Sequence, residues 1–308
     1  MSRLFTLAIA LSALGTTVCI HAQQGSSQTP APWPLSNAVR ERGSSVTGAY
    51  EGWYYNKDGS INLLVGYFNR NTKQELDIPI GPNNRIEPGG PDLGQPTHFL
   101  TGRQWGVFTI KVPKDFGAKK LTWTIVSNGQ TNVITMHTKP EWVVEPLEDP
   151  ANKNTPPVLK FSEDGPGLSG PPVGIAATYA ATVGVPLTLT VWATDEGPKI
   201  NVPEPPPDRG RGRGRGDAAA TPAPPPLTVT WSVIRGQSAA VKFDEAKPKV
   251  DLEHGGKTVA TATFAEPGEY LLRVQGNDST GEGGGGFQCC WSNAHVKVTV
   301  KTAQTSGQ

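Results

Sequence analysis

The most reactive side chains of the chain are two adjacent cysteines, Cys289 and Cys290. The third cysteine, Cys19, falls in a predicted signal peptide, so the mature chain keeps only this pair. Thiols in an oxidising compartment tend to pair, and these two have only each other within the chain. We therefore predict a vicinal disulfide, which would close a strained ring before the last strand. An intermolecular disulfide, a soft-metal site with His295 and unpaired thiols are the alternatives.

Three acidic residues, Asp195, Glu196 and Asp278, fall at predicted strand ends, where calcium would find hard oxygen ligands. The Asp-x-Asp-x-Asp density of strong calcium sites is absent. The sequence thus leaves two interpretations, a calcium site of low affinity or solvated loop carboxylates. It indicates no other cofactor.

Aromatic side chains gather on a predicted hairpin that carries Trp53, Tyr55 and Tyr67. Alternation sends Trp53 and Tyr55 to one face and Tyr54 to the other. One face must belong to the core, and aromatics on the other face would match the apolar faces of sugar rings. These residues are candidate binding residues, and ordinary core packing with cross-strand pairing is the alternative.

No set of residues with catalytic spacing is present. The histidines of the mature chain, His98, His137, His254 and His295, are scattered, without His-x-His or Glu-x-x-His spacing. The Gly-x-Ser-x-Gly elbow of serine hydrolases is also missing. Paired catalytic carboxylates leave no sequence signature, so a hydrolase remains an alternative to the non-catalytic protein that we predict.

The first residues have the pattern of an export signal. Arg3 supplies the positive charge, residues 4–14 the apolar stretch, and residues 20–22 (Ile-His-Ala) a cleavage site. The apolar stretch is too short for a bilayer, and no later stretch approaches the roughly 20 apolar residues of a membrane helix. We expect a secreted or periplasmic protein without a membrane span.

Charge favours no class of polyanionic partner. The chain has 28 Lys and Arg against 27 Asp and Glu, and loss of Arg3 with the signal makes them equal. No global field therefore attracts nucleic acid or anionic membrane. The Arg-Gly repeat at residues 209–216 could contact acidic polymers, although a solvated tether is the simpler interpretation. An exported protein is not expected to meet nucleic acid.

Short alternating segments between Gly, Pro, Asn and Asp clusters predict an all-β fold. Asp-Gly at residues 58–59 and Asn-Gly at residues 128–129 predict two hairpins in the first half. Residues 142–144 are predicted as the last strand of that half. In the second half the predicted strands are 186–192, 227–233, 258–264, 269–275 and 294–300.

These segments predict two tandem immunoglobulin-like β-sandwiches joined by a Pro/Gly-rich linker. The predicted parts are a signal peptide at 1–22, a disordered leader at 23–45, a first sandwich at 46–147, a linker at 148–175, a second sandwich at 176–301 with a disordered Pro/Arg-Gly insertion at 197–226, and a tail at 302–308.

Several motifs in the second half carry a resemblance, most specifically Pro267-Gly268-Glu269-Tyr270, which leads into a strand that ends at Asp278. Residues 187–189, 193–195 and 229–231 add to it. On these residues the second half resembles the PKD and related immunoglobulin-like modules of extracellular bacterial proteins. Where PKD modules carry Trp-Asp-Phe-Gly-Asp-Gly, Ser-Val-Ile-Arg-Gly follows Trp231 here. The first half is not matched to a family of known function.

The resemblance implies a spacer, adhesion or ligand-presenting role, and such modules also accompany exported hydrolases. Together with export, it predicts a non-catalytic binding or adhesion module of the cell envelope that contacts a protein or polysaccharide. An enzyme would instead show two acids about 5 to 10 Å apart in a cleft. A structural spacer would show neither a cleft nor exposed aromatics.

Overall fold

Strands form almost all of the regular structure. The computed structural model describes residues 39–150, 153–197, 227–278 and 290–303, and the helices among them are three short 3-10 segments. The prediction of an all-β fold is confirmed. None of these described helices has the length and apolar character needed to cross a membrane. The predicted signal peptide, residues 198–226 of the predicted insertion, and Cys289 lie outside the described residues.

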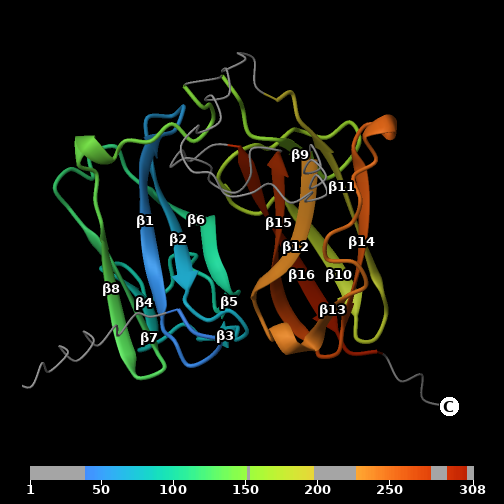
Figure 1. Ribbon diagram of the computed structural model, residues 1–308, viewed down its shortest axis with the longest axis horizontal. Coiled ribbons are helices and arrows are strands. Elements are labelled where there is room, and N and C mark those ends of the chain that lie inside the picture. Colours follow the sequence, from blue (N-terminus) through green and yellow to red (C-terminus); the bar gives the residue numbers. More distant parts are fainter. Residues whose placement is uncertain (1–38, 151–152, 198–226, 279–289, 304–308) are drawn as a thin grey trace, which may run out of the picture. The chain divides into compact units, whose positions relative to one another are not determined.

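The first sandwich has two main sheets and one small one (Figure 1). Its hairpin turns are those that the sequence predicts, and Asn128 and Gly129 both have the positive φ of a two-residue hairpin turn. The sheets comprise β1 (Val46–Tyr55), β2 (Ile61–Asn69) and β6 (Gly102–Val112); β4 (Asn84–Glu87), β7 (Leu121–Ser127) and β8 (Gln130–Met136); and β3 (Leu76–Asp77) with β5 (His98–Phe99).

Aromatic rings fill the centre of the first sandwich. Phe108 meets Trp123 edge-on at 5.3 Å between ring centroids, and Tyr67 meets Phe99 at 4.9 Å. The buried indole N–H of Trp123 donates to the Oδ1 atom of Asn84 at 2.9 Å, which satisfies its one polar group. These contacts tie β2, β5, β6 and β7 into one core.

The prediction of a strand at residues 142–144 is wrong. Pro140–Trp142 forms a 3-10 helix instead, and Val143 makes only an isolated bridge to Trp53. Proline lacks an N–H and has a fixed φ, so it suits the first position of a helix and not a central strand.

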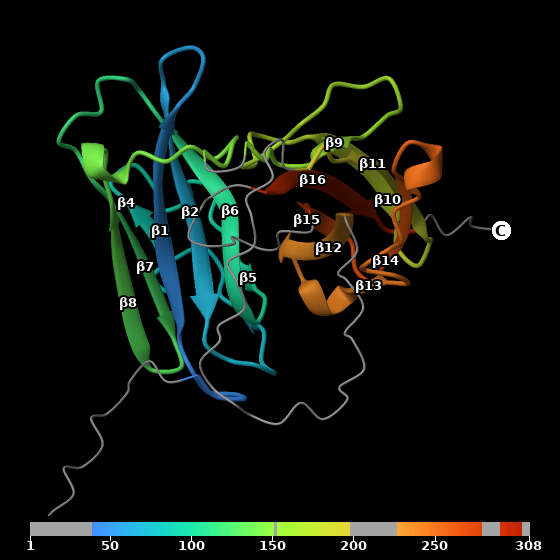
Figure 2. The same cartoon turned by 45° about the horizontal axis from the view of Figure 1, so that its top comes forward.

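The second sandwich has two four-stranded sheets with the orders β10-β16-β15-β12 and β13-β14-β11-β9 (Figures 1 and 2). β10 runs parallel to β16, whereas the other named pairs of these sheets are antiparallel. This is the strand order of an immunoglobulin-like sandwich. The strands are β9 (Val158–Lys160), β10 (Ala177–Thr182), β11 (Leu187–Thr194), β12 (Leu227–Arg235), β13 (Val241–Phe243), β14 (Lys257–Phe264), β15 (Gly268–Asp278) and β16 (Trp291–Lys301).

Two segments predicted as irregular contribute ordered structure. β9 lies within the predicted linker, pairs with β11 and buries Leu159 completely. A strand of three residues is too short for a period of two to appear in the sequence. Near the end of the predicted leader, Ser44 and Ser45 are buried. The ordered structure therefore starts before residue 46, and the second sandwich begins before residue 176.

Tyr270 forms the corner where the chain enters β15. Its hydroxyl donates to the carbonyl of Glu266 at 2.9 Å, and its ring packs on Phe264. Gly236 allows this packing, because a Cβ there would lie 2.7 Å from the ring. A tyrosine that bonds back to the backbone just upstream is a hallmark of immunoglobulin-like sandwiches.

Replacement of Tyr270 by phenylalanine is expected to lower the free energy of unfolding by about 1 kcal/mol, because the Glu266 carbonyl loses its donor. Urea unfolding followed by intrinsic fluorescence measures the change. Tyr55→Phe is the matched control, since the side chain of Tyr55 is largely exposed. Equal stability of the two variants would show that the corner bond contributes nothing.

The two sandwiches belong to one compact unit, Asn37–Gln308. Side chains of β16 bond to the backbone of β6. The Asn293 amide donates to the carbonyls of Trp105 and Gly106, both at 3.0 Å. The His295 Nε2–H donates to the Val107 carbonyl at 2.8 Å. Three consecutive backbone carbonyls of β6 thus bond to side chains of β16.

Polar contacts continue beside this region. The Arg235 guanidinium binds both carboxylate oxygens of Asp92, at 2.6 and 3.0 Å, and lowers the pKa of Asp92. Its Nε–H donates to the Gln95 carbonyl at 2.8 Å. The Thr97 N–H donates to the Ile234 carbonyl at 2.9 Å, and the Ile234 side chain is buried in the core of the first sandwich.

Candidate functional site

The three predicted binding aromatics do not share one exposed face. Tyr67 is completely buried and its hydroxyl accepts a bond from the Leu100 N–H. Trp53 is also buried, and its indole donates to the Lys139 carbonyl. Tyr55 is 65% exposed and meets Trp53 edge-on at 5.0 Å, on the same side of the hairpin as expected. Only Tyr55 of the three is open to a ligand.

Another aromatic group lies at the surface of the first sandwich, with Tyr50 and His137 partly buried and Trp142 exposed. We name Tyr50, His137 and Trp142 the aromatic cluster. Tyr50 and Trp142 stack at 5.3 Å with an interplanar angle of 21°, and His137 is edge-on to both. Trp142 is 42% exposed. The Tyr50 hydroxyl donates to the His137 carbonyl, and burial raises the pKa of Tyr50. The indole of Trp142 therefore packs on a tyrosine ring that is held in place, and part of the indole is open to solvent.

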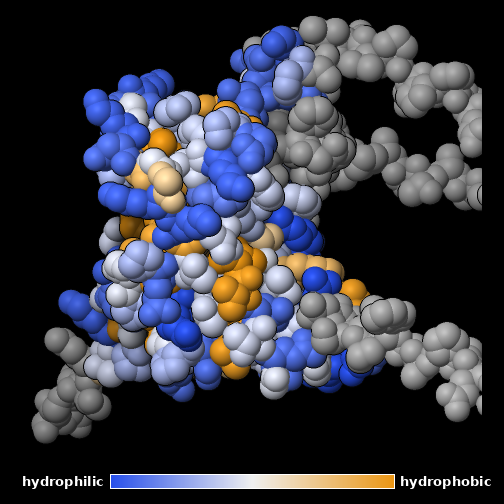
Figure 3. All heavy atoms as spheres, turned by 90° about the vertical axis from the view of Figure 1, so that its left-hand side faces the viewer, coloured by the Kyte–Doolittle hydropathy of each residue, from blue (hydrophilic) through white to orange (hydrophobic). Residues whose placement is uncertain are grey.

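Backbone contacts fix the position of Trp142. Gly52 allows the close approach, because a Cβ there would lie 2.6 Å from the Trp142 carbonyl. Next along the chain, the Val144 N–H donates to the Trp53 carbonyl at 3.0 Å. Val143 and Leu147 are exposed too, so apolar surface extends beyond the indole. Figure 3 views the side that carries β8 and shows apolar residues between hydrophilic ones.

The three predicted calcium ligands lie close enough to interact. The pKa of Asp195 is raised to about 6, mainly by burial and then by the charges of Asp278 and Glu196. The Asn154 amide donates to Asp278. Among the described residues no three His, Cys, Asp or Glu side chains are arranged to hold a metal ion. Calcium binding stays a prediction.

Cys290 is buried beside these acids. It has a φ of +80°, and its sulfur accepts a hydrogen bond from the Asn154 amide at 3.1 Å. Because Cys289 lies outside the described residues, the vicinal disulfide also stays a prediction.

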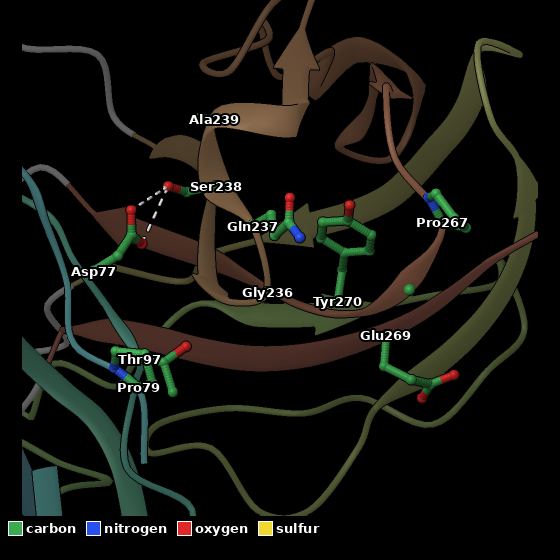
Figure 4. A pocket seen from close by; sticks show the side chains of 11 residues that line it. Asp77, Pro79, Thr97, Gly236, Gln237, Ser238, Ala239, Pro267, Glu269 and Tyr270 are labelled. Carbon is green, nitrogen blue, oxygen red and sulfur yellow. Dashed lines mark hydrogen bonds between the residues drawn. The ribbon is translucent and has the colours of Figure 1, made fainter. Parts of the chain in front are cut away.

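A groove runs between the two sandwiches. Its wider part, about 590 Å³, is lined by Pro79, Pro267 and Tyr270 among others (Figure 4). Its narrower part, about 380 Å³, shares Asp77 and Ser238 with the wider part. The Ser238 hydroxyl lies 3.3 Å from both carboxylate oxygens of Asp77, so this bond marks the boundary between the parts. We call both parts together the groove.

A histidine bound by two carboxylates forms one wall of the groove. His98 is buried, with Nδ1 2.8 Å from Asp77 Oδ1 and Nε2 3.0 Å from Glu75 Oε2. Both ring nitrogens are thus engaged, and the Ser238 hydroxyl contacts Asp77 instead of the ring. A nucleophilic triad needs a ring nitrogen directed at the hydroxyl, so this arrangement is not one.

The strand order and the tyrosine corner define the second half as an immunoglobulin-like β-sandwich. No family model matches the sequence, and no curated protein matches it either. Fibronectin(III)-like modules of CbhA from Clostridium thermocellum align with 15% identity and a TM-score of 0.22, covering 86% of this chain and 98% of that one. Titin domains z1z2 in complex with telethonin align with 9% identity and a TM-score of 0.24, covering 83% and 98%.

The D00-D0 domain of intimin aligns with 10% identity and a TM-score of 0.25, covering 83% of this chain and 100% of that one.

Proposed function

We propose that the chain is an exported, non-catalytic binding module of the cell envelope that contacts a polysaccharide through the aromatic cluster. The observation that carries the proposal is the half-exposed indole of Trp142 stacked on Tyr50. The faces of sugar rings are lined by C–H groups, which pack well against an indole face. Because the indole is already held against Tyr50, little side-chain entropy would be lost on binding.

Export is supported by the charged and apolar pattern of residues 1–22. The PKD-like interpretation of the second sandwich is supported by the Pro-Gly-x-Tyr turn before β15. A protein partner is the second candidate, since exposed Val143 and Leu147 would suit a protein surface as well as a glycan.

Trp142→Ala is expected to weaken binding to an envelope polysaccharide about tenfold, because an exposed anchor of the interface is lost. The measurement is cosedimentation of the purified chain with peptidoglycan sacculi, before and after protease treatment, with cellulose and chitin in parallel. Trp142→Phe keeps a ring and should retain part of the affinity.

Val259→Ala is the matched control, because Val259 is an apolar residue of similar exposure (45%) on the second sandwich. Its affinity should equal that of the unaltered chain. Equal binding by Trp142→Ala, or no binding of the unaltered chain to any of the three polymers, would contradict the glycan proposal. Binding that disappears when the sacculi are treated with protease would indicate a protein partner instead.

A further inference from the structure

A hydrogen-bonding group that lines the narrower part of the groove has no partner among the described residues. It is the hydroxyl of Ser232 in β12, and Ser232 is 8% exposed. Because side chains alternate along a strand, Ser232 lies on the opposite face of β12 from Trp231, which belongs to the core of the second sandwich. Buried polar groups in native proteins nearly always have a partner, because an unmade bond costs free energy. The unpartnered hydroxyl thus indicates a site for a hydrogen-bond acceptor.

The opposite wall is acidic. Glu75 and Asp77 each use one oxygen to hold His98, and about half of each carboxylate side chain remains exposed. Asp77 also accepts from Ser238. Glu75 holds His98 with Oε2, and its Oε1 accepts no hydrogen bond within the described part of the chain. The acidic wall therefore favours a cationic group, while Leu100, Val241 and Phe243 supply apolar contacts.

We propose that the groove binds an extended peptide segment that carries a basic residue. A peptide carbonyl accepts from the Ser232 hydroxyl, and a Lys or Arg side chain pairs with Glu75 and Asp77. An extended peptide presents a carbonyl at every residue and a charged side chain within a few ångströms of it, so it supplies both groups at once. The charge of the acidic wall favours such a peptide over a neutral glycan. The wider part of the groove, which reaches Pro267 and Tyr270, leaves room for further residues (Figure 4).

The experiment measures binding of a fluorescent Gly-Arg-Gly-Arg-Gly amide to the full chain by anisotropy at low salt, with Gly-Glu-Gly-Glu-Gly amide as the comparison peptide. Only the basic peptide should bind. Glu75→Gln keeps the size of the side chain and removes its charge, and it should weaken binding roughly tenfold. Ser232→Ala should weaken binding severalfold.

Ser232→Ala also separates a binding role from a structural one. Because the hydroxyl has no partner in the described structure, its removal should leave the midpoint of urea unfolding unchanged or higher. A fall in both stability and affinity would assign the hydroxyl a structural role and overturn its place in the site.

Glu253→Gln is the matched control for charge, because Glu253 is an exposed acid on a 3-10 helix of the second sandwich. It should bind the basic peptide as the unaltered chain does. Equal losses in Glu253→Gln and Glu75→Gln would show diffuse surface attraction and overturn the proposal. Equal binding of both peptides, or of neither, would overturn it as well.

Discussion

Replacement of Gly106 by alanine is expected to lower the free energy of unfolding by about 4 kcal/mol and the Tm by about 10 °C. Gly106 lies in β6 with a φ of +49°, where a side chain adds backbone strain. A Cβ there would lie 1.8 Å from Cη2 of Trp291. Trp291 is completely buried against Tyr54 and Leu64, so it has no free space to enter. Calorimetry measures the change.

Gly129→Ala is the matched control, because Gly129 also has a positive φ (+74°) but nothing lies within 4 Å of an added Cβ. This variant should lower the free energy of unfolding by only about 1 kcal/mol, the cost of a side chain at a positive φ. A loss in Gly106→Ala no larger than this would contradict the close contact between β6 and β16.

A second variant tests the cause of the loss. Trp291→Phe removes the outer ring atoms that an alanine at position 106 would meet. The double variant should therefore lose less stability than the sum of the two single losses. Additive losses would mean that the collision with Trp291 is not what destabilises Gly106→Ala.

The parts of the fold that the sequence predicts are those determined by neighbouring residues. Asp-Gly and Asn-Gly fix two hairpins because each supplies the backbone conformation of its turn. Tyr270 could be expected at a corner, because its bond to Glu266 spans only four residues. β9 was missed because three residues carry no periodicity.

The candidate sites depend on residues that are distant in the sequence. The aromatic cluster joins Tyr50 in β1 with His137 and Trp142, roughly ninety residues later. The groove joins the region of β3 and β5 with β12 and β13. Periodicity places a residue on a face of its own strand, and it does not tell which strand faces it across a sandwich. The unpartnered hydroxyl of Ser232 is for the same reason visible only in three dimensions.

Two titratable groups of opposite behaviour lie where β6 meets its neighbours. Burial raises the pKa of Glu51 to about 7, although Arg103 and the Gly106 N–H oppose this. Burial lowers the pKa of His295 to about 4. Glu51 accepts from Arg103 at 2.6 Å and from the Gly106 N–H at 2.9 Å, and His295 donates to the adjacent Val107. Both side chains therefore bind to the same short stretch of β6.

Their effects on stability have opposite signs. Folded Glu51 holds its proton more tightly than the unfolded chain, whose ordinary pKa is 4.5. The stability that Glu51 gains from this tighter binding is complete below pH 4.5 and is lost as the pH rises through 7. Folded His295 holds its proton less tightly than the unfolded chain, whose ordinary pKa is 6.5. Its contribution is present above pH 6.5 and is lost as the pH falls through 4. Between pH 4.5 and 6.5 the two changes, about 2 kcal/mol each, nearly cancel.

Glu51→Gln is therefore expected to lose about 2 kcal/mol more stability than the unaltered chain when the pH falls from 6.5 to 4.5. His295→Gln should lose about 2 kcal/mol less, and the double variant should follow the unaltered chain. Each glutamine keeps a bonding atom, an acceptor for the Gly106 N–H or a donor for the Val107 carbonyl. Urea unfolding at several pH values measures the free energies, and the other titrating groups drop out of the comparison because all four proteins share them. If the free energies of unfolding of all four proteins changed in parallel with pH, neither Glu51 nor His295 would titrate at an unusual pH. In that case water would reach the contact between β6 and β16, because exclusion of water is what shifts both groups.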